Sequence, residues 1–176
     1  METRFNLIVC VNNKGVIGRN NDLLYHIRND MQNFRRLTLN NAVIMGSATY
    51  ESLPTKPLKN RLNIVITRNI DKYKNADGVI AVNSLEEATK MAKDYADAFI
   101  IGGASIYNQF LDKGTVDRVI LTEVDDNSEE ADDAKILMPW KLKPNEWQVR
   151  FQTYYITDEN GISFRYSILD NKKKKI

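Results

Sequence analysis

The pattern of apolar positions predicts alternating strands and helices along most of the chain. Short runs that are apolar at nearly every position are typical of strands covered by helices on both faces. The candidate strands are residues 5–11, 42–45, 62–67, 78–82, 98–101 and 117–124. The candidate helices, where apolar residues recur at helical spacing, are 28–39, 48–53, 84–94 and 104–112. Ser84 and Glu87 have the spacing of a capping box, which supports a helix start there. This alternation predicts an α/β fold with a largely parallel sheet.

The C-terminal part of the chain has a different pattern. Two strand-like segments, 147–156 and 163–168, flank the sequence Asp-Glu-Asn-Gly, which is typical of a hairpin turn. We therefore expect an antiparallel pair at this end. The sequence contains neither an internal repeat nor a Gly/Ser-rich linker, and we predict a single domain over 1–176. The lysine-rich stretch from about residue 170 is expected to be a solvated basic tail.

Composition and charge narrow the class of protein. Lys and Arg number 25 against 23 Asp and Glu, a net charge of +2, which argues against a nucleic-acid or membrane surface. The single cysteine, Cys10, excludes an internal disulfide, and we interpret it as a small apolar residue and not a nucleophile. His26, the only histidine, is interpreted as solvent-exposed. Because no long apolar run or metal-ligand cluster occurs, we expect a soluble, cytoplasmic protein without a metal.

Three predicted strands end in residues that suit a phosphate group. These ends are Gly46 with Ser47 and Thr49, Thr67 with Arg68, and Gly102 with Gly103. Glycine lets a ligand approach the backbone closely, and the start of a following helix offers free N–H groups. Ligands of parallel sheets bind at the C-terminal ends of the strands. A tight turn would explain the paired glycines equally well, but the three ends together favour a nucleotide site.

Asp30 is the candidate functional carboxylate of the first helix. Asp30, Met31, Phe34 and Leu37 recur at helical spacing, so the carboxylate lies beside an apolar stripe. One interpretation is that Asn29 or Asp30 only stabilises the helix start. The functional alternative is a carboxylate at the edge of an apolar pocket. There it could bind two adjacent N–H groups of a flat heterocycle, with Phe34 against its face.

Several blocks of the sequence, taken together, resemble the dihydrofolate reductase family in order and spacing over nearly the whole chain. The blocks are VIG (16–18), NDMQNFRRLT (29–38), VIMGSATYESL (43–53), NRLNIVITR (60–68), IIGGASIYNQFL (100–111) and LTEV (121–124). The resemblance implies a three-layer sandwich with four flanking helices around an eight-stranded sheet, parallel except for its C-terminal strand. It also implies reduction of 7,8-dihydrofolate to tetrahydrofolate with NADPH as cofactor, and antifolate inhibitors as further small-molecule ligands.

The resemblance also implies roles for individual residues. Asp30 would bind the pterin ring and Thr122 would bridge to it, while Tyr25 would hold a catalytic water. The substrate would be lined by Ile8, Val9, Cys10, Met31, Phe34, Leu53, Leu58, Arg61, Ile101 and Tyr107, with Arg61 on the α-carboxylate of the glutamate tail. The cofactor would be held by Cys10, Ile17, Gly18, Asn20, Leu23, Gly46, Ser47, Ala48, Thr49, Ile66, Thr67, Arg68, Ile101, Gly102, Gly103, Ala104, Ser105, Ile106 and Tyr107. In the family, the peptide bond joining the paired glycines is cis.

The sequence departs from the family pattern in three places. The usual Pro-Trp after the active-site loop is Leu24-Tyr25, where tyrosine keeps a polar tip on an aromatic ring. The usual basic residue after Gly46 is Ser47, which leaves Arg68 as the main candidate to bind the 2′-phosphate of the cofactor. The acidic segment 125–135 is longer than usual, and we expect a solvated loop in which Asp133 contacts the active-site loop.

Two other functions are compatible with these residues. A pyrimidine reductase of riboflavin synthesis shares the fold and would use NADPH on a ribosylamino-pyrimidine. A nucleotide-binding module without catalysis would bind NADPH but would not turn over any pterin. The combination of Asp30, Phe34 and Arg61 favours a folate, and we expect a monomer that binds dihydrofolate.

Overall fold

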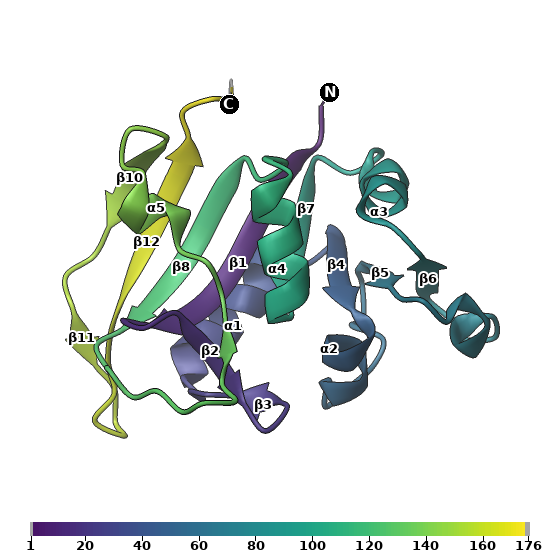
Figure 1. Ribbon diagram of the computed structural model, residues 1–176. Coiled ribbons are helices and arrows are strands. Elements are labelled where there is room, and N and C mark those ends of the chain that lie inside the picture. Colours follow the sequence, from purple (N-terminus) through teal and green to yellow (C-terminus); the bar gives the residue numbers. More distant parts are fainter. Residues whose placement is uncertain (1, 175–176) are drawn as a thin grey trace.

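The computed structural model describes residues 2–174, and a single mixed sheet forms its centre. The strands of this sheet are β1 (Arg4–Asn12), β4 (Ala42–Gly46), β5 (Leu62–Ile66), β6 (Val79–Val82), β7 (Asp97–Gly102), β8 (Arg118–Val124), β10 (Trp147–Gln152), β11 (Ile156–Thr157) and β12 (Ser163–Asn171). Eight of them lie in the order β10-β12-β8-β1-β7-β4-β5-β6, and β11 pairs with β12 (Figure 1). Only β12 runs against the others, so the predicted antiparallel C-terminal strand is confirmed.

All four predicted helices are present. They are α1 (Arg28–Thr38), α2 (Ser47–Ser52), α3 (Leu85–Ala92) and α4 (Ala104–Asp112). The predicted cap is also present, because the Ser84 hydroxyl accepts a hydrogen bond from the Glu87 backbone N–H at 3.1 Å. The short helix α5 (Pro139–Leu142) and the 3₁₀ turn η1 (Ile70–Tyr73) were not predicted, since one turn carries too little periodicity.

The helices cover both faces of the sheet and complete the predicted three layers. Alternate residues of one strand face opposite layers. Leu7 and Val9 of β1 belong to the core shared with α3 and α4, whereas Ile8 packs with the core under α1 and α2. In Figure 1, α4 crosses the sheet in front and α1 lies behind it. One face of the sheet therefore carries the core under α3 and α4, and the opposite face carries the core beside α1 and α2.

A second, small sheet was not predicted. Its order is β3-β2-β9, from β2 (Val16–Arg19), β3 (Asp22–Leu23) and β9 (Ala134–Lys135). Two of these strands have only two residues, which is too short to show an alternation of apolar and polar positions in the sequence. This sheet joins the loop after β1 to the end of the acidic segment 125–135.

Two predictions at the C-terminus need correction. The segment 147–156 is not one strand, because β10 ends at Gln152 and β11 begins at Ile156. The solvated tail does not begin at residue 170, because β12 continues to Asn171 and both Asp170 and Asn171 are buried. Asp170 is held there by Arg118 at 2.7 Å. Residues 175 and 176 of the lysine-rich stretch lie outside the described residues.

The topology brings the C-terminal ends of the parallel strands to one edge. In the sheet, β7 lies between β1 and β4. From this point the chain continues toward one side of the sheet through β4, β5 and β6, and toward the other side through β8 and β12. Such a reversal opens a binding position beyond the strand ends. Among residues 2–174, no helix has the length and apolar character needed to cross a bilayer.

Candidate active site

A carboxylate and a hydroxyl meet at the centre of the candidate site. Asp30 lies in the first turn of α1, and Thr122 lies on β8, 92 residues away. The Thr122 hydroxyl donates a hydrogen bond to Asp30 Oδ1 at 2.5 Å. A carboxylate without its proton can only accept, so this hydroxyl is a natural donor to it. The carboxylate is thus fixed in orientation and keeps its second oxygen for another donor.

Burial makes this carboxylate a better proton acceptor than an ordinary aspartate. Burial raises the pKa of Asp30, and the hydrogen bond from Thr122 opposes this shift without cancelling it. Cys10, opposite Thr122 in the sheet, is half-buried, and desolvation together with the Asp30 charge raises the pKa of its thiol. Cys10 therefore stays a neutral thiol, as expected of an apolar strand residue.

Half-buried apolar side chains gather on the α1 face of the sheet. Ile8, Leu37, Leu53, Leu58 and Ile101 all pack against the cluster formed by Val43, Met45, Tyr50, Val65, Tyr73 and Phe99. Phe34 is half-buried one turn after Asp30, and Met31 is 44% exposed. Four of the residues expected to line a substrate are therefore brought together on one face: Ile8, Leu53, Leu58 and Ile101.

Val9 and Tyr107 are exceptions among the expected lining residues, because both belong to the buried core under α3 and α4. The Val9 side chain is 6% exposed. The structure does not bring this side chain to the Asp30 face, because strand alternation assigns Ile8 and Cys10 to one side and Val9 to the other. Val9 could contact a ligand at Asp30 only through its backbone.

Arg61 marks the far end of the same face. Its Nη1 donates to the Thr38 hydroxyl at 3.0 Å, at the last residue of α1. Burial lowers the pKa of Arg61, and the nearby Arg35 lowers it further. Among the ion pairs of residues 2–174, neither arginine has a carboxylate partner. Two neighbouring unpaired guanidinium groups are suited to an anionic ligand.

The paired glycines lie where β7 ends and α4 begins. Their peptide bond is cis, in agreement with the family pattern. Gly102 has a φ of +131°, and a Cβ there would lie 3.4 Å from Thr49 Oγ1 and 3.6 Å from Tyr107. The Tyr107 hydroxyl donates to the Ile8 carbonyl at 2.7 Å, which ties α4 to β1. No side chain caps α4, so N–H groups of its first turn remain available to an anion.

Replacing Gly102 by alanine is expected to lower the free energy of unfolding by about 1–3 kcal/mol. A φ of +131° lies outside the small left-handed region that residues with a Cβ can enter. The control is Gly161→Ala, since Gly161 has a φ of +79° and its Cβ would meet nothing within 4 Å. Denaturant unfolding should give a larger loss for Gly102→Ala. Equal losses would show that no special constraint acts on Gly102.

The other expected cofactor residues gather around the same edge. Gly46, Ser47, Ala48 and Thr49 form the β4–α2 junction, Ile66, Thr67 and Arg68 end β5, and Ala104, Ser105 and Ile106 begin α4. Ile17, Gly18, Asn20 and Leu23 lie in or between β2 and β3, and Leu23 is 48% exposed. Arg68 is exposed and makes no ion pair within residues 2–174. It is the one basic side chain among these residues.

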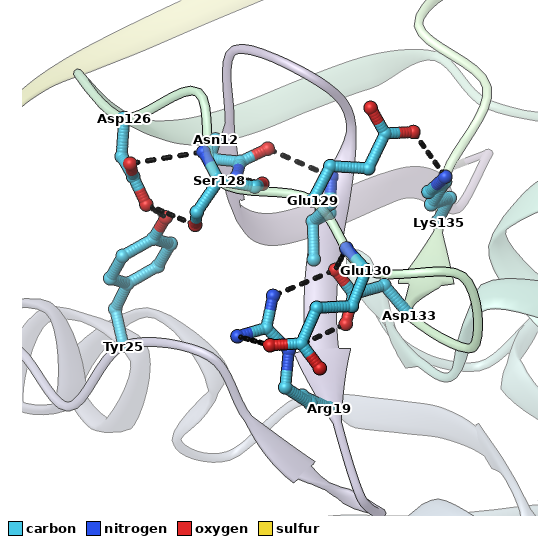
Figure 2. A network of polar contacts seen from close by, with 10 residues as sticks. Asn12, Arg19, Tyr25, Asp126, Ser128, Glu129, Glu130, Asp133 and Lys135 are labelled. Carbon is cyan, nitrogen blue, oxygen red and sulfur yellow. Dashed lines mark hydrogen bonds and ion pairs between the residues drawn. The ribbon is translucent and has the colours of Figure 1, made fainter.

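The loop between β2 and α1 is attached to the acidic segment 125–135. Arg19 binds Asp133 through two hydrogen bonds of 2.7 and 2.9 Å, and it also pairs with Glu130 at 2.8 Å (Figure 2). The expected contact of Asp133 with the loop is thus present, and it lowers the pKa of Asp133 to about 2. His26 is exposed, as predicted, and its Nε2 lies 3.6 Å from the carboxylate of the exposed Asp22.

Tyr25 has a partner that the sequence did not indicate. Its hydroxyl donates to Asp126 Oδ2, from the same acidic segment (Figure 2). Two further residues of this network, Asn12 and Ser128, were also missed. The available signal was an Asp-x-Ser turn placed directly after a strand, which is common in loops and carries no functional meaning by itself.

Comparison with known proteins identifies the family. The family model for dihydrofolate reductase matches residues 4–171. The dihydrofolate reductase of Haemophilus influenzae is 34% identical over 169 residues, covering 96% of this chain and 99% of the relative. That of Aedes albopictus is 30% identical over 187 residues, covering 97% of this chain and 99% of the relative.

A solved structure agrees with this result. Dihydrofolate reductase from Enterococcus faecalis, complexed with NADP(H) and RAB-propyl, has a TM-score of 0.81 and 26% identity, and the match covers 96% of both chains. The match covers nearly the whole chain, including the central sheet and its helices. This chain belongs to the dihydrofolate reductase family.

Proposed function

We propose that this protein reduces 7,8-dihydrofolate to 5,6,7,8-tetrahydrofolate with NADPH, by hydride transfer to C6 and protonation of N5. The observation that carries the proposal is the half-buried Asp30 carboxylate, oriented by Thr122, on one face with Arg61, which has no carboxylate partner. Asp30 and Thr38 are eight residues apart on α1, which places Arg61 about 12 Å from Asp30 along the helix axis. This spacing suits a ligand with a heterocycle at one end and a carboxylate at the other.

The side chains have distinct tasks in this proposal. Asp30 accepts hydrogen bonds from two adjacent N–H groups of the pterin, and Thr122 keeps the carboxylate in the ring plane. Ile8, Phe34 and Ile101 exclude water from the faces of the ring, and Arg61 binds the α-carboxylate of the glutamate tail. Asp30 does not hand a proton to N5, and a water near Tyr25 supplies it. The alignment of the reacting atoms accounts for much of the rate.

The residues of the sheet edge fit a dinucleotide cofactor. The uncapped start of α4 offers N–H groups to a phosphate, and Gly102 and Gly103 leave the space that a Cβ would fill. NADPH, when bound, supplies the hydride. Thr67 and Arg68 would hold its 2′-phosphate, because Ser47 is not basic. The bound NADP(H) of the Enterococcus faecalis relative supports this choice of cofactor.

Arg68→Gln is expected to raise the KM for NADPH by about 10–100-fold, the range of a hydrogen bond between charged groups. The KM for NADH should stay the same, since NADH lacks the 2′-phosphate. Steady-state rates with both cofactors measure this difference. Lys141→Gln, which removes an exposed positive charge from α5, is the control. An unchanged NADPH preference in Arg68→Gln would show that another group selects the cofactor.

The proposed function is tested by following loss of the reduced nicotinamide absorbance with dihydrofolate. Turnover is expected with dihydrofolate and NADPH, and a ribosylamino-pyrimidine should not be reduced. Binding of NADPH without turnover of any pterin would instead favour a nucleotide-binding module.

We also propose that the protein acts as a monomer in the cytoplasm, where tetrahydrofolate enters one-carbon metabolism and antifolates would inhibit it. The balanced charge and single cysteine support that location.

A further inference from the structure

Asp126 is connected to a rigid part of the fold through a short series of hydrogen bonds. Ser128 donates to it twice, from its backbone N–H to Oδ1 at 3.0 Å and from its hydroxyl to Oδ2 at 2.5 Å. Asn12, buried at the end of β1, donates to the Ser128 carbonyl at 2.8 Å. The Asn12 side-chain oxygen accepts from the backbone of Val16 at 3.0 Å. The Asp126 carboxylate is therefore fixed relative to the central sheet.

The bond between Tyr25 and Asp126 determines the position of the phenolic proton. Tyr25 donates to Asp126, so its oxygen can only accept a hydrogen bond from any other group. Burial, and then the bond to Asp126, raise the pKa of Tyr25 to about 12, against smaller opposing effects of the nearby Asn12 and Ser128 side chains. The bonds from Ser128 and Tyr25 lower the pKa of Asp126, which keeps the acceptor ionised. Toward any group other than Asp126, the Tyr25 oxygen is thus a hydrogen-bond acceptor of fixed orientation, and the phenol does not give up its proton.

Tyr25 also belongs to the surroundings of the candidate site. It packs with Cys10 and Tyr166 against the cluster of Ile27, Val124 and Phe164. Cys10 and Tyr166 flank Thr122 on the two neighbouring strands, β1 and β12. The Asp30 charge raises the pKa of both, which places Asp30 within electrostatic reach of the residues around Tyr25.

We propose that Asp126 is a positioning residue that acts through Tyr25 and fixes the phenol oxygen as an acceptor for a water at the edge of the site. The inference rests on the proposed function, since it concerns the water that reaches the substrate. Figure 2 shows Tyr25 and Arg19 attached to the acidic segment at separate points. Arg19 and Asp133 hold the loop, whereas Asp126 sets the orientation of one side chain.

The experiment compares Tyr25→Phe, Asp126→Ala and the double variant in steady-state reduction of dihydrofolate by NADPH. Each single variant should lower kcat about tenfold, the effect of losing one hydrogen bond to a charged group, with a nearly unchanged KM for dihydrofolate. The double variant should be no slower than either single one, because both changes remove the same interaction. Asp126→Asn, which keeps an oxygen acceptor, should recover most of the rate lost in Asp126→Ala. The control is Asp125→Ala, since exposed Asp125 contacts Asn13 and not Tyr25.

A purely structural role for Asp126 would produce different results. Either Tyr25→Phe would keep wild-type kcat, or the losses of the two single variants would multiply in the double variant, and either result overturns the inference. Tyr25→Phe keeps the aromatic ring, so it decides the question even if Asp126→Ala does not fold. A wild-type protein without turnover contradicts the proposed function and this inference with it. An active wild type with unaffected variants contradicts the inference alone.

Discussion

Asp30→Asn should reduce turnover of dihydrofolate by about 10²–10⁴-fold at neutral pH. Asparagine keeps the shape and can still accept from Thr122, but it removes the charge and replaces one acceptor oxygen with a donor. The pterin then meets an N–H group where it needs an acceptor. The measurement is kcat with saturating NADPH for the variant and the wild type. Asp22→Asn is a matched control, because Asp22 is an exposed carboxylate outside the α1 face.

The loss should shrink as the medium is made acidic. Because the pKa of Asp30 is raised, the wild type begins to lose its own carboxylate at a higher pH than an ordinary aspartate would. Below that pKa the side chain at position 30 is neutral in both proteins. Protonation of N5 then no longer depends on the active site, because the acidic medium supplies the proton. A constant ratio of rates across the acid range, or wild-type turnover in the variant at neutral pH, would refute the role of Asp30.

The same substitution should stabilise the fold at neutral pH. With a raised native pKa, the native state binds more protons than the unfolded state, so stability falls as pH rises from about 3.8 through the native pKa of Asp30. Above that window the full cost of the buried charge is present, and Asp30→Asn removes it. Thermal melting should show a higher Tm for the variant at neutral pH and no difference in strong acid. A lower Tm at neutral pH would mean that Asp30 stabilises the fold.

Arg61→Ala is expected to raise the KM for dihydrofolate by about 10–100-fold with little change in kcat, the range of a lost hydrogen bond between charged groups. The contact with the glutamate tail is the same in the ground state and the transition state, so it contributes to binding and not to chemistry. A dihydropterin without the glutamate tail is the control substrate. Wild type and variant should reduce it equally. A lower kcat on both substrates would assign Arg61 to the structure of the α1 face instead.

The sheet and its four helices could be predicted because each has a strong local pattern. β4, β5 and β7 are apolar at nearly every position, and the spacing of Ser84 and Glu87 indicates the start of α3. The small sheet β3-β2-β9 and the break between β10 and β11 could not be predicted. Two-residue strands are defined by their partners, which lie far away in sequence, and not by their own residues.

The candidate site shows the same division between local and distant information. Asp30 could be placed on an apolar helix face from its spacing, and the resemblance connected it to Thr122 across 92 residues. Strand alternation could have excluded the Val9 side chain, but the match to the family pattern was given more weight. The Tyr25–Asp126 bond joins residues 101 positions apart in a departure from the family pattern, so neither spacing nor resemblance could reveal it.

The most direct test of the account is a single turnover with dihydrofolate and NADPH that carries deuterium at the transferable position of C4. The proposed function predicts tetrahydrofolate with one deuterium at C6, and almost no product from Asp30→Asn in the same time. Unlabelled tetrahydrofolate, deuterium at another carbon, or no product from the wild type would contradict direct hydride transfer at this site.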